Sequence, residues 1–211
     1  MQKIKLITFD LNETLIKENT WKDLNLALGI PLEEDQRLFR QYRNKEITYL
    51  EWQRTIVDRY KKYANPTRDR MEKIIFNYHF LPGARKAVKY LQSKGYILAV
   101  ISGSIDSLVR KVAQELGIKY YHANNSLVFD KKRALQDIKV ENDEGPAKLK
   151  HLKKICRKLK ISLKECACVG DGLSDIELFR KTGKGVTFKG SKVEKYAWKK
   201  INNLNDLQEI F

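Results

Sequence analysis

Residues 4–14 read Ile-Lys-Leu-Ile-Thr-Phe-Asp-Leu-Asn-Glu-Thr, an apolar segment that ends on an acidic side chain. Its apolar residues first alternate with others and then run together, which is typical of a strand buried inside a sheet. Asp10 follows directly, and a carboxylate at the tip of a buried strand is costly unless it has a partner or a task. The stretch therefore predicts a central strand that carries a functional carboxylate at its carboxyl end.

Beyond residue 80, helical and strand-like segments alternate along the chain. Helical periodicity marks residues 84–93, 105–116, 148–160 and 174–181, and strand-like segments lie at 96–101, 119–122, 126–129, 134–140, 166–169, 185–188 and 200–201. Strands separated by helices imply parallel crossovers with helices on both faces of the sheet. The predicted fold class is α/β, a three-layer Rossmann-like core built on a parallel sheet.

The segment between residues 20 and 78 has a different character. Apolar residues recur there at helical spacing in four groups, and Gly29-Ile30-Pro31 and Asn65-Pro66-Thr67 punctuate them. Because no strand-like run interrupts these helices, we expect a small helical cap inserted into the core. The predicted domains are a core of residues 1–17 and 80–211 and a cap of residues 18–79.

Polar residues follow the predicted strands at their carboxyl ends. Asp10, Asn12, Ser102 and Asp171 all occupy such positions, and open α/β sheets bind ligands at that edge. A carboxylate can act as a covalent nucleophile toward phosphorus if a cation and hydrogen-bond donors offset the negative charge of the phosphate. The pattern therefore points to phosphoryl chemistry.

Four segments, in this order, resemble the motifs of the haloacid dehalogenase superfamily, and specifically its phosphoserine-phosphatase-like branch. They are Asp10-Leu11-Asn12-Glu13-Thr14, Ile101-Ser102-Gly103-Ser104, Lys148, and Val169-Gly170-Asp171-Gly172-Leu173-Ser174-Asp175. Together with the helical insert, the similarity covers nearly the whole chain. The resemblance implies a phosphatase that needs Mg²⁺ and passes through an aspartyl-phosphate.

The resemblance also implies roles for individual residues. Asp10 would be the nucleophile and, with the backbone carbonyl of Asn12 and the carboxylate of Asp171, would hold the magnesium ion, whose preferred ligands are oxygens. Asp175 would support the ion from its outer shell or through a water molecule. The phosphoryl oxygens would be held by Ser102, Gly103, Ser104 and Lys148. In relatives that act on phosphoserine, a glutamate and an arginine of the cap bind the amino acid; Glu18, one position from the expected glutamate, and Arg54 or Arg59 are the candidates here.

Asn12 departs from the family pattern. Most phosphatases of the family have an aspartate there, which protonates the leaving group and then activates water, whereas an amide cannot transfer a proton. General acid–base catalysis contributes about 10²–10⁴-fold. Three interpretations stay open: a natural variant with weakened or specialised phosphatase activity, a substitution introduced to trap a complex, and a protein that binds phosphate without turning it over.

The bulk composition bounds the remaining possibilities. The formal net charge is +16, but the richest basic stretch, residues 148–160, forms the solvated face of an amphipathic helix. A nucleic-acid partner is therefore not expected, although the charge does not exclude one. No run of about 18 apolar residues and no signal-peptide pattern occurs. Three cysteines without a C-x-x-C pair predict buried side chains rather than a disulfide framework or zinc site.

The leading prediction is a cytoplasmic Mg²⁺-dependent phosphomonoesterase that acts on a small phosphorylated metabolite, has no membrane partner and exists as a monomer or homodimer. Two alternatives stay open. One is a catalytically weakened phosphate-binding or regulatory module, and the other is a phosphatase that acts on nucleic-acid ends.

Overall fold

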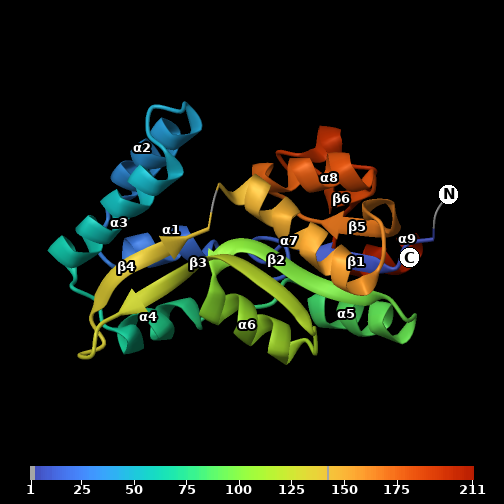
Figure 1. Cartoon of the computed structure of the whole chain (residues 1–211), viewed down its shortest axis with the longest axis horizontal. Coiled ribbons are helices and arrows are strands. Elements are labelled where there is room, and N and C mark those ends of the chain that lie inside the picture. The colour runs from blue at the N-terminus through green and yellow to red at the C-terminus, as the bar shows by residue number, and fades with distance from the viewer. Residues whose placement is uncertain (1–2, 142) are drawn as a thin grey trace.

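A computed structural model describes residues 3–141 and 143–211 of the chain (Figure 1). Within this part, the strands form one seven-stranded sheet in the order β4-β3-β2-β1-β5-β6-β7. All neighbours pair in parallel except β3 and β4, which are antiparallel. The strands are β1 (Leu6–Phe9), β2 (Ile97–Ile105), β3 (Tyr120–Phe129), β4 (Leu135–Val140), β5 (Cys166–Val169), β6 (Gly185–Phe188) and β7 (Lys199–Ile201). The predicted α/β class is confirmed.

Helices cover both faces of the sheet, so the core has three layers (Figure 1). One face is covered by α5 (Ala84–Ser93), α6 (Asp106–Glu115) and α9 (Leu207–Ile210), and the other by α7 (Glu144–Leu159) and α8 (Ile176–Thr182). Short 3-10 turns lie at Leu163–Glu165, Leu173–Asp175, Glu194–Tyr196 and Leu204–Asp206. The central strand β1 is completely buried between these layers, as its apolar sequence predicts.

Four helices form the insert between β1 and α5: α1 (Thr20–Ala27), α2 (Leu32–Arg43), α3 (Tyr49–Tyr63) and α4 (Arg68–Ile75). The side chains of Asn19, Thr48 and Thr67 accept backbone N–H bonds at the starts of α1, α3 and α4, which stabilises those helix ends. These local signals explain why the polar residues before each apolar group mark a helix start.

The insert packs on the β3–β4 hairpin, which reaches out from the sheet toward it (Figure 1). The Arg68 N–H donates to the Arg133 carbonyl at 2.8 Å, and the Leu135 N–H donates to the Pro66 carbonyl at 3.0 Å. Leu135 and Ile138 of β4 are buried in the apolar cluster that also contains residues of the insert. The outer part of the hairpin therefore shares its core with the helices of residues 20–75.

Two details of the expected secondary structure were wrong. The segments predicted as separate strands at 119–122 and 126–129 form the single strand β3. The strand continues through Asn124 and Asn125, whose side chains are both buried, and the Asn125 amide nitrogen donates to the Gly103 carbonyl at 2.6 Å. Strand β2 likewise continues past Ser102 to Ile105, and the following helix starts only at Asp106.

Candidate active site

Asp10 follows β1 at the carboxyl edge of the sheet. Its N–H donates to the Val169 carbonyl of β5 at 2.9 Å, and its Oδ1 accepts the Leu11 N–H at 2.7 Å. The chain then turns sharply, because the Leu15 N–H bonds back to the Leu11 carbonyl at 2.8 Å. These contacts fix the Asp10 side chain at the tip of the central strand, where 12% of it is exposed.

Lys148 brings a buried positive charge to Asp10. Its ammonium lies 2.8 Å from Asp10 Oδ2 and 2.7 Å from Asp175 Oδ1, and only 1% of the side chain is exposed. Burial alone would lower the pKa of Lys148, but the charges of the neighbouring carboxylates outweigh it and raise that pKa. Lys148 is therefore a permanent cation of the site rather than one of the solvated lysines of α7.

Asp171 and Asp175 approach Asp10 from the segment after β5. One ligand oxygen of each of the three carboxylates lies within 4.8 Å of the others. The Thr14 hydroxyl donates to Asp171 Oδ1 at 2.6 Å, and the Gly172 N–H donates to Asp175 Oδ2 at 3.1 Å. Gly170 leaves room for Asp175, since a Cβ there would lie 2.9 Å from its Oδ1.

The three carboxylates of this cluster carry more negative charge than the single positive charge of Lys148 can balance. Burial raises the pKa of Asp171 to about 7, and the charge of Asp10 adds to the effect. Burial also raises the pKa of Asp175 to about 6, although Lys148 opposes this rise. A set of carboxylate oxygens under this repulsion suits a hard divalent cation, which would replace the extra protons.

The segment Ser102–Ser104 lies beside Asp10 on the neighbouring strand. Phe9 pairs with Val100, so the residues that follow in β1 and β2 emerge at the same edge of the sheet. The Ser104 N–H donates to Ser102 Oγ at 3.2 Å, which leaves the Ser102 hydroxyl hydrogen free to point elsewhere. The three residues belong to β2, and α6 begins two residues later at Asp106, so the segment lies near a helix start as expected.

Gly103 is held from two sides. Its carbonyl accepts the Asn125 amide at 2.6 Å and the indole N–H of Trp21, in the insert, at 3.2 Å. Sequence reasoning did not identify Trp21 or Asn125, and both lie far from Gly103 along the chain. These contacts connect the insert directly with the segment expected to bind phosphate.

Asn12 is also connected to the insert. Its Oδ1 accepts a hydrogen bond from the Thr20 hydroxyl at 2.6 Å, at the first residue of α1. The carbonyl side of the amide is thereby occupied, and Nδ2 is the end that can donate to another group. Asn12 can thus orient a ligand by hydrogen bonding.

The two substrate-binding candidates of the cap, Glu18 and Arg54, have neighbours other than the clustered carboxylates. The Glu18 carboxylate accepts the His79 N–H at 2.9 Å and lies 2.8 Å from its ring nitrogen Nδ1. Arg54 is exposed on α3, next to Gln53, which belongs to the buried side of that helix. A role of Glu18 or Arg54 in substrate binding stays a prediction, while Arg59 is paired with Glu34 at 2.6 Å.

Glu144, the first residue of α7, is an acidic side chain that sequence reasoning missed. A Cβ on Gly103 would lie 2.8 Å from Glu144 Oε2, so the carboxyl group packs directly against that glycine. Burial raises the pKa of Glu144 and outweighs the opposing charge of Lys148, and the charges of Asp10 and Asp175 add to the rise. The feature of the sequence that could have pointed to Glu144 is its position four residues before Lys148, on the same face of one helix.

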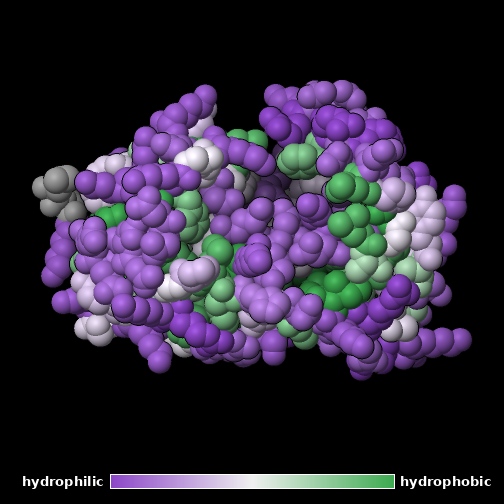
Figure 2. Space-filling view, turned by 180° about the vertical axis from the view of Figure 1, so that it is seen from behind, coloured by the Kyte–Doolittle hydropathy of each residue, from purple (hydrophilic) through white to green (hydrophobic). Residues whose placement is uncertain are grey.

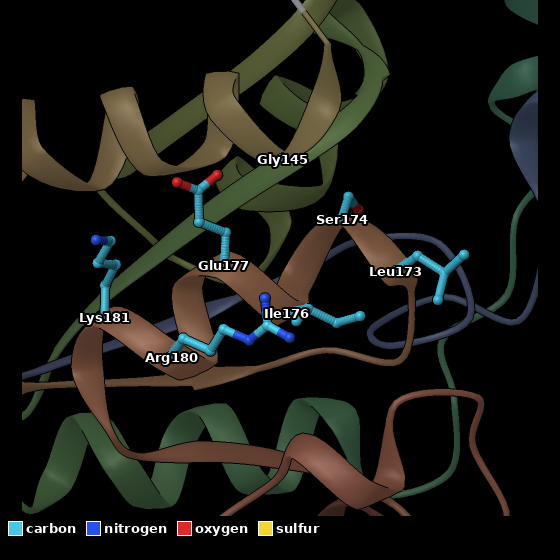
Figure 3. A pocket seen from close by; sticks show the side chains of 7 residues that line it. All are labelled: Gly145, Leu173, Ser174, Ile176, Glu177, Arg180 and Lys181. Atoms are coloured by element: carbon cyan, nitrogen blue, oxygen red, sulfur yellow. The ribbon is translucent and has the colours of Figure 1, made fainter. Parts of the chain in front are cut away.

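The surface beside α8 is hollowed. Figure 2 shows a notch between the lobe of the insert and the lobe of α8. A pocket of about 600 Å³ is lined by residues of α8 and of the turn before it, and Figure 3 shows Ser174 and Glu177 there facing the start of α7 at Gly145. Its seven lining residues do not include the three clustered carboxylates, so it lies beside the site rather than over it.

The other sequence expectations that the structure addresses concern the cysteines and the membrane. Cys156, Cys166 and Cys168 are free and buried, as predicted. Among the helices of the described residues, none has the length and apolar character needed to cross a membrane.

Comparisons with known proteins agree with this geometry. Residues 4–183 match the model of the haloacid dehalogenase-like hydrolase family. The phosphoserine phosphatase of Methanocaldococcus jannaschii is 29% identical over 99% of this chain and 97% of its own length. That of Streptococcus thermophilus is 27% identical over 89% of this chain and 86% of its own.

Solved structures lead to the same family. The structure of a phospho-aspartyl intermediate analogue of phosphoserine phosphatase matches with a TM-score of 0.84 and 27% identity, covering all of both chains. A phosphoserine phosphatase in its apo form matches with a TM-score of 0.82 and 29% identity, over 99% of this chain and 98% of the other. The chain therefore belongs to the haloacid dehalogenase-like hydrolase family, and within it is a phosphatase of the phosphoserine-phosphatase-like branch.

Proposed function

We propose that this chain is a Mg²⁺-dependent phosphomonoesterase that hydrolyses a small phosphorylated metabolite through an aspartyl-phosphate on Asp10. The observation that supports this most directly is the convergence of Asp10, Asp171 and Asp175 around the buried ammonium of Lys148. Residues 1–17 and 80–211 would form the catalytic core, and residues 18–79, together with the outer β3–β4 hairpin, would cap it.

Each residue of the site has a task in this proposal. Asp10 attacks phosphorus, Lys148 holds the nucleophile and a phosphoryl oxygen, and the Ser102 hydroxyl with the Gly103 and Ser104 segment binds the remaining oxygens. Mg²⁺ held by the carboxylates and the backbone carbonyl of Asn12 would shield the charge between phosphate and nucleophile. Trp21, Thr20 and Tyr49 of the insert lie at this edge and would surround the leaving group.

The test is a phosphate-release screen across phosphorylated metabolites and an aryl phosphate, with magnesium in excess. We expect turnover of the aryl phosphate and of a small group of metabolites, and none in excess chelator. A chain that binds phosphate but releases none from any ester would instead be a binding module. Selective release from DNA or RNA ends, with affinity that falls steeply with salt, would favour the nucleic-acid alternative.

Magnesium binding should strengthen as the pH rises. Folding raises the pKa of Asp171 to about 7 and that of Asp175 to about 6, above the value of about 3.9 in an unfolded chain. The metal-free folded state therefore binds extra protons, and its stability falls as the pH rises from about 4 to 7. Because the ion replaces these protons, we expect a larger increase of Tm with Mg²⁺ at pH 8 than at pH 5.5.

Thermal denaturation with and without Mg²⁺ at the two pH values measures this difference. Asp171→Asn should remove most of the Mg²⁺-induced shift, whereas Asp58→Asn, an exposed position on α3, should preserve it. An equal shift at both pH values would show that these carboxylates do not hold the ion.

A further inference from the structure

The proposed reaction lacks a proton donor among the residues that the family resemblance identifies. An alkyl alcohol leaves as a basic alkoxide unless it is protonated, and Asn12 has no transferable proton. The oxygen of its side-chain amide moreover accepts a hydrogen bond from the Thr20 hydroxyl at 2.6 Å. An acid elsewhere in the site would have to supply the proton.

Glu144 shares one face of α7 with Lys148, because the two residues are four positions apart in the same helix. Lys148 reaches Asp10 at 2.8 Å, so Glu144 lies one turn closer to the helix N-terminus and to the insert. Its carboxyl group packs against Gly103, in the middle of the Ser102–Ser104 segment. The Ser174 side chain hydrogen-bonds to it from the other side. The position of Glu144 is therefore set by three separate segments of the site.

The charges around Glu144 show which part of the site it occupies. On the core side, Glu144 interacts electrostatically with Lys148, Asp10 and Asp175. On the side of the insert, its charge adds to the effect of burial in raising the pKa of Tyr49. Its charge also raises the pKa of Tyr42, after burial and the charge of Asp143. Glu144 thus lies between the nucleophile and the insert.

The leaving group must occupy that same region. In phosphoryl transfer, the attacking and leaving oxygens lie roughly in line on opposite sides of phosphorus. With Asp10 at the tip of β1 as the nucleophile and the phosphoryl oxygens held at Ser102 and Gly103, the leaving oxygen would point away from the sheet toward the insert. Glu144 has its carboxyl group beside Gly103 and interacts electrostatically with Tyr49 of the insert, so it borders the region that this oxygen would enter.

Resting on the proposed phosphatase function, we propose that Glu144 is the general acid and base of the reaction. As Asp10 bonds to phosphorus and the bond from phosphorus to the alcohol oxygen breaks, the Glu144 carboxyl group gives its proton to that oxygen. The resulting carboxylate then takes a proton from the water that attacks the aspartyl-phosphate. The bond between phosphorus and Asp10 breaks and phosphate is released. The free Asp10 carboxylate and protonated Glu144 are thereby restored. A raised pKa, caused mainly by burial, favours the protonated form that the first step requires.

Four forms of the chain test this role: the parent, Glu144→Gln, Asn12→Asp and the double variant, each assayed with an alkyl and a nitrophenyl phosphate in excess Mg²⁺. Glu144→Gln should lower kcat/KM for the alkyl ester by about 10²-fold or more and for the nitrophenyl ester by less than about tenfold, since nitrophenolate leaves without a proton. Asn12→Asp alone should change alkyl turnover little. In the double variant, the new carboxylate should restore most of the alkyl activity that Glu144→Gln removes.

Glu177→Gln is the matched control, because Glu177 faces the first turn of α7 from α8 (Figure 3) but is outside the proposed reaction. It should leave both substrates unaffected. If Glu144→Gln does not fold, Glu144→Ala is the second variant, and added formic acid should restore part of its alkyl turnover.

Three outcomes would overturn the proposal in different ways. An equal loss on both esters would mean that Glu144 only shapes the phosphate pocket. A gain on both would mean that its carboxylate competes with phosphate for the site. A parent chain that hydrolyses neither ester with Mg²⁺ would refute the phosphatase function itself, and the role of Glu144 with it.

Discussion

Asp10→Asn should lower phosphate release by roughly 10⁴-fold or more, because it removes the nucleophile of the proposed reaction while the size of the side chain is preserved. An amide at this position cannot form an acyl phosphate and pairs only weakly with Lys148. The measurement is kcat for an aryl phosphate with saturating Mg²⁺, since that substrate isolates the attack on phosphorus from the protonation of the leaving group.

The stability of the variant separates a chemical from a structural effect. The substitution removes one of three carboxylates that lie within 4.8 Å of each other, so metal-free unfolding should show little loss of stability. Intact-protein mass spectrometry on the rapidly quenched parent should detect a phosphoryl group that the variant lacks, and Asp58→Asn should behave as the parent. Turnover of the variant within tenfold of the parent would contradict the covalent role of Asp10.

Lys148→Met should destabilise the metal-free protein by about 3–5 kcal/mol at neutral pH, because it leaves buried carboxylates without their cation. Lys148 contacts Asp10 and Asp175 and is 1% exposed, so water cannot replace its charge. Turnover should fall as well, since the nucleophile and the phosphate lose a shared positive partner. Urea denaturation in excess chelator measures the first effect, and phosphate release with Mg²⁺ measures the second.

The pH dependence of this loss has a defined sign. Without the cation, the pKa of Asp175 rises further above its value in the unfolded chain, so the folded variant binds more protons than the unfolded one. Its stability then falls as the pH rises, and the difference from the parent should be larger at pH 8 than at pH 5. Lys153→Met, on the exposed side of the same helix, should change stability little. A similar cost at both positions would show that the buried ion pairs do not stabilise the fold.

Local sequence patterns were sufficient for the fold class and for placing Asp10 and Asp171 at one edge of the sheet. A buried strand of the parallel sheet has an apolar sequence whatever its neighbours are, and helices between strands dictate parallel crossovers. Asp10 and Asp171 each follow such a strand, so their meeting at one edge of the sheet follows from topology alone. Lys148 was identified only through the resemblance to the family, and the structure places its ammonium between Asp10 and Asp175.

Contacts between segments that are far apart in the chain leave no signal in the local sequence. Only the tertiary structure shows them. Strand β3 continues through Asn124 and Asn125, and the amide nitrogen of Asn125 donates to the Gly103 carbonyl and to the Tyr49 hydroxyl, partners that only the folded sheet and the insert bring near. Glu144 resembles any charged first residue of a helix in the sequence. It becomes part of the site because the register of β2 against β1 and the packing of α7 bring its carboxyl group against Gly103. Such contacts depend on how elements dock, and docking is set by the fit of entire apolar faces rather than by the residues that meet at the edge.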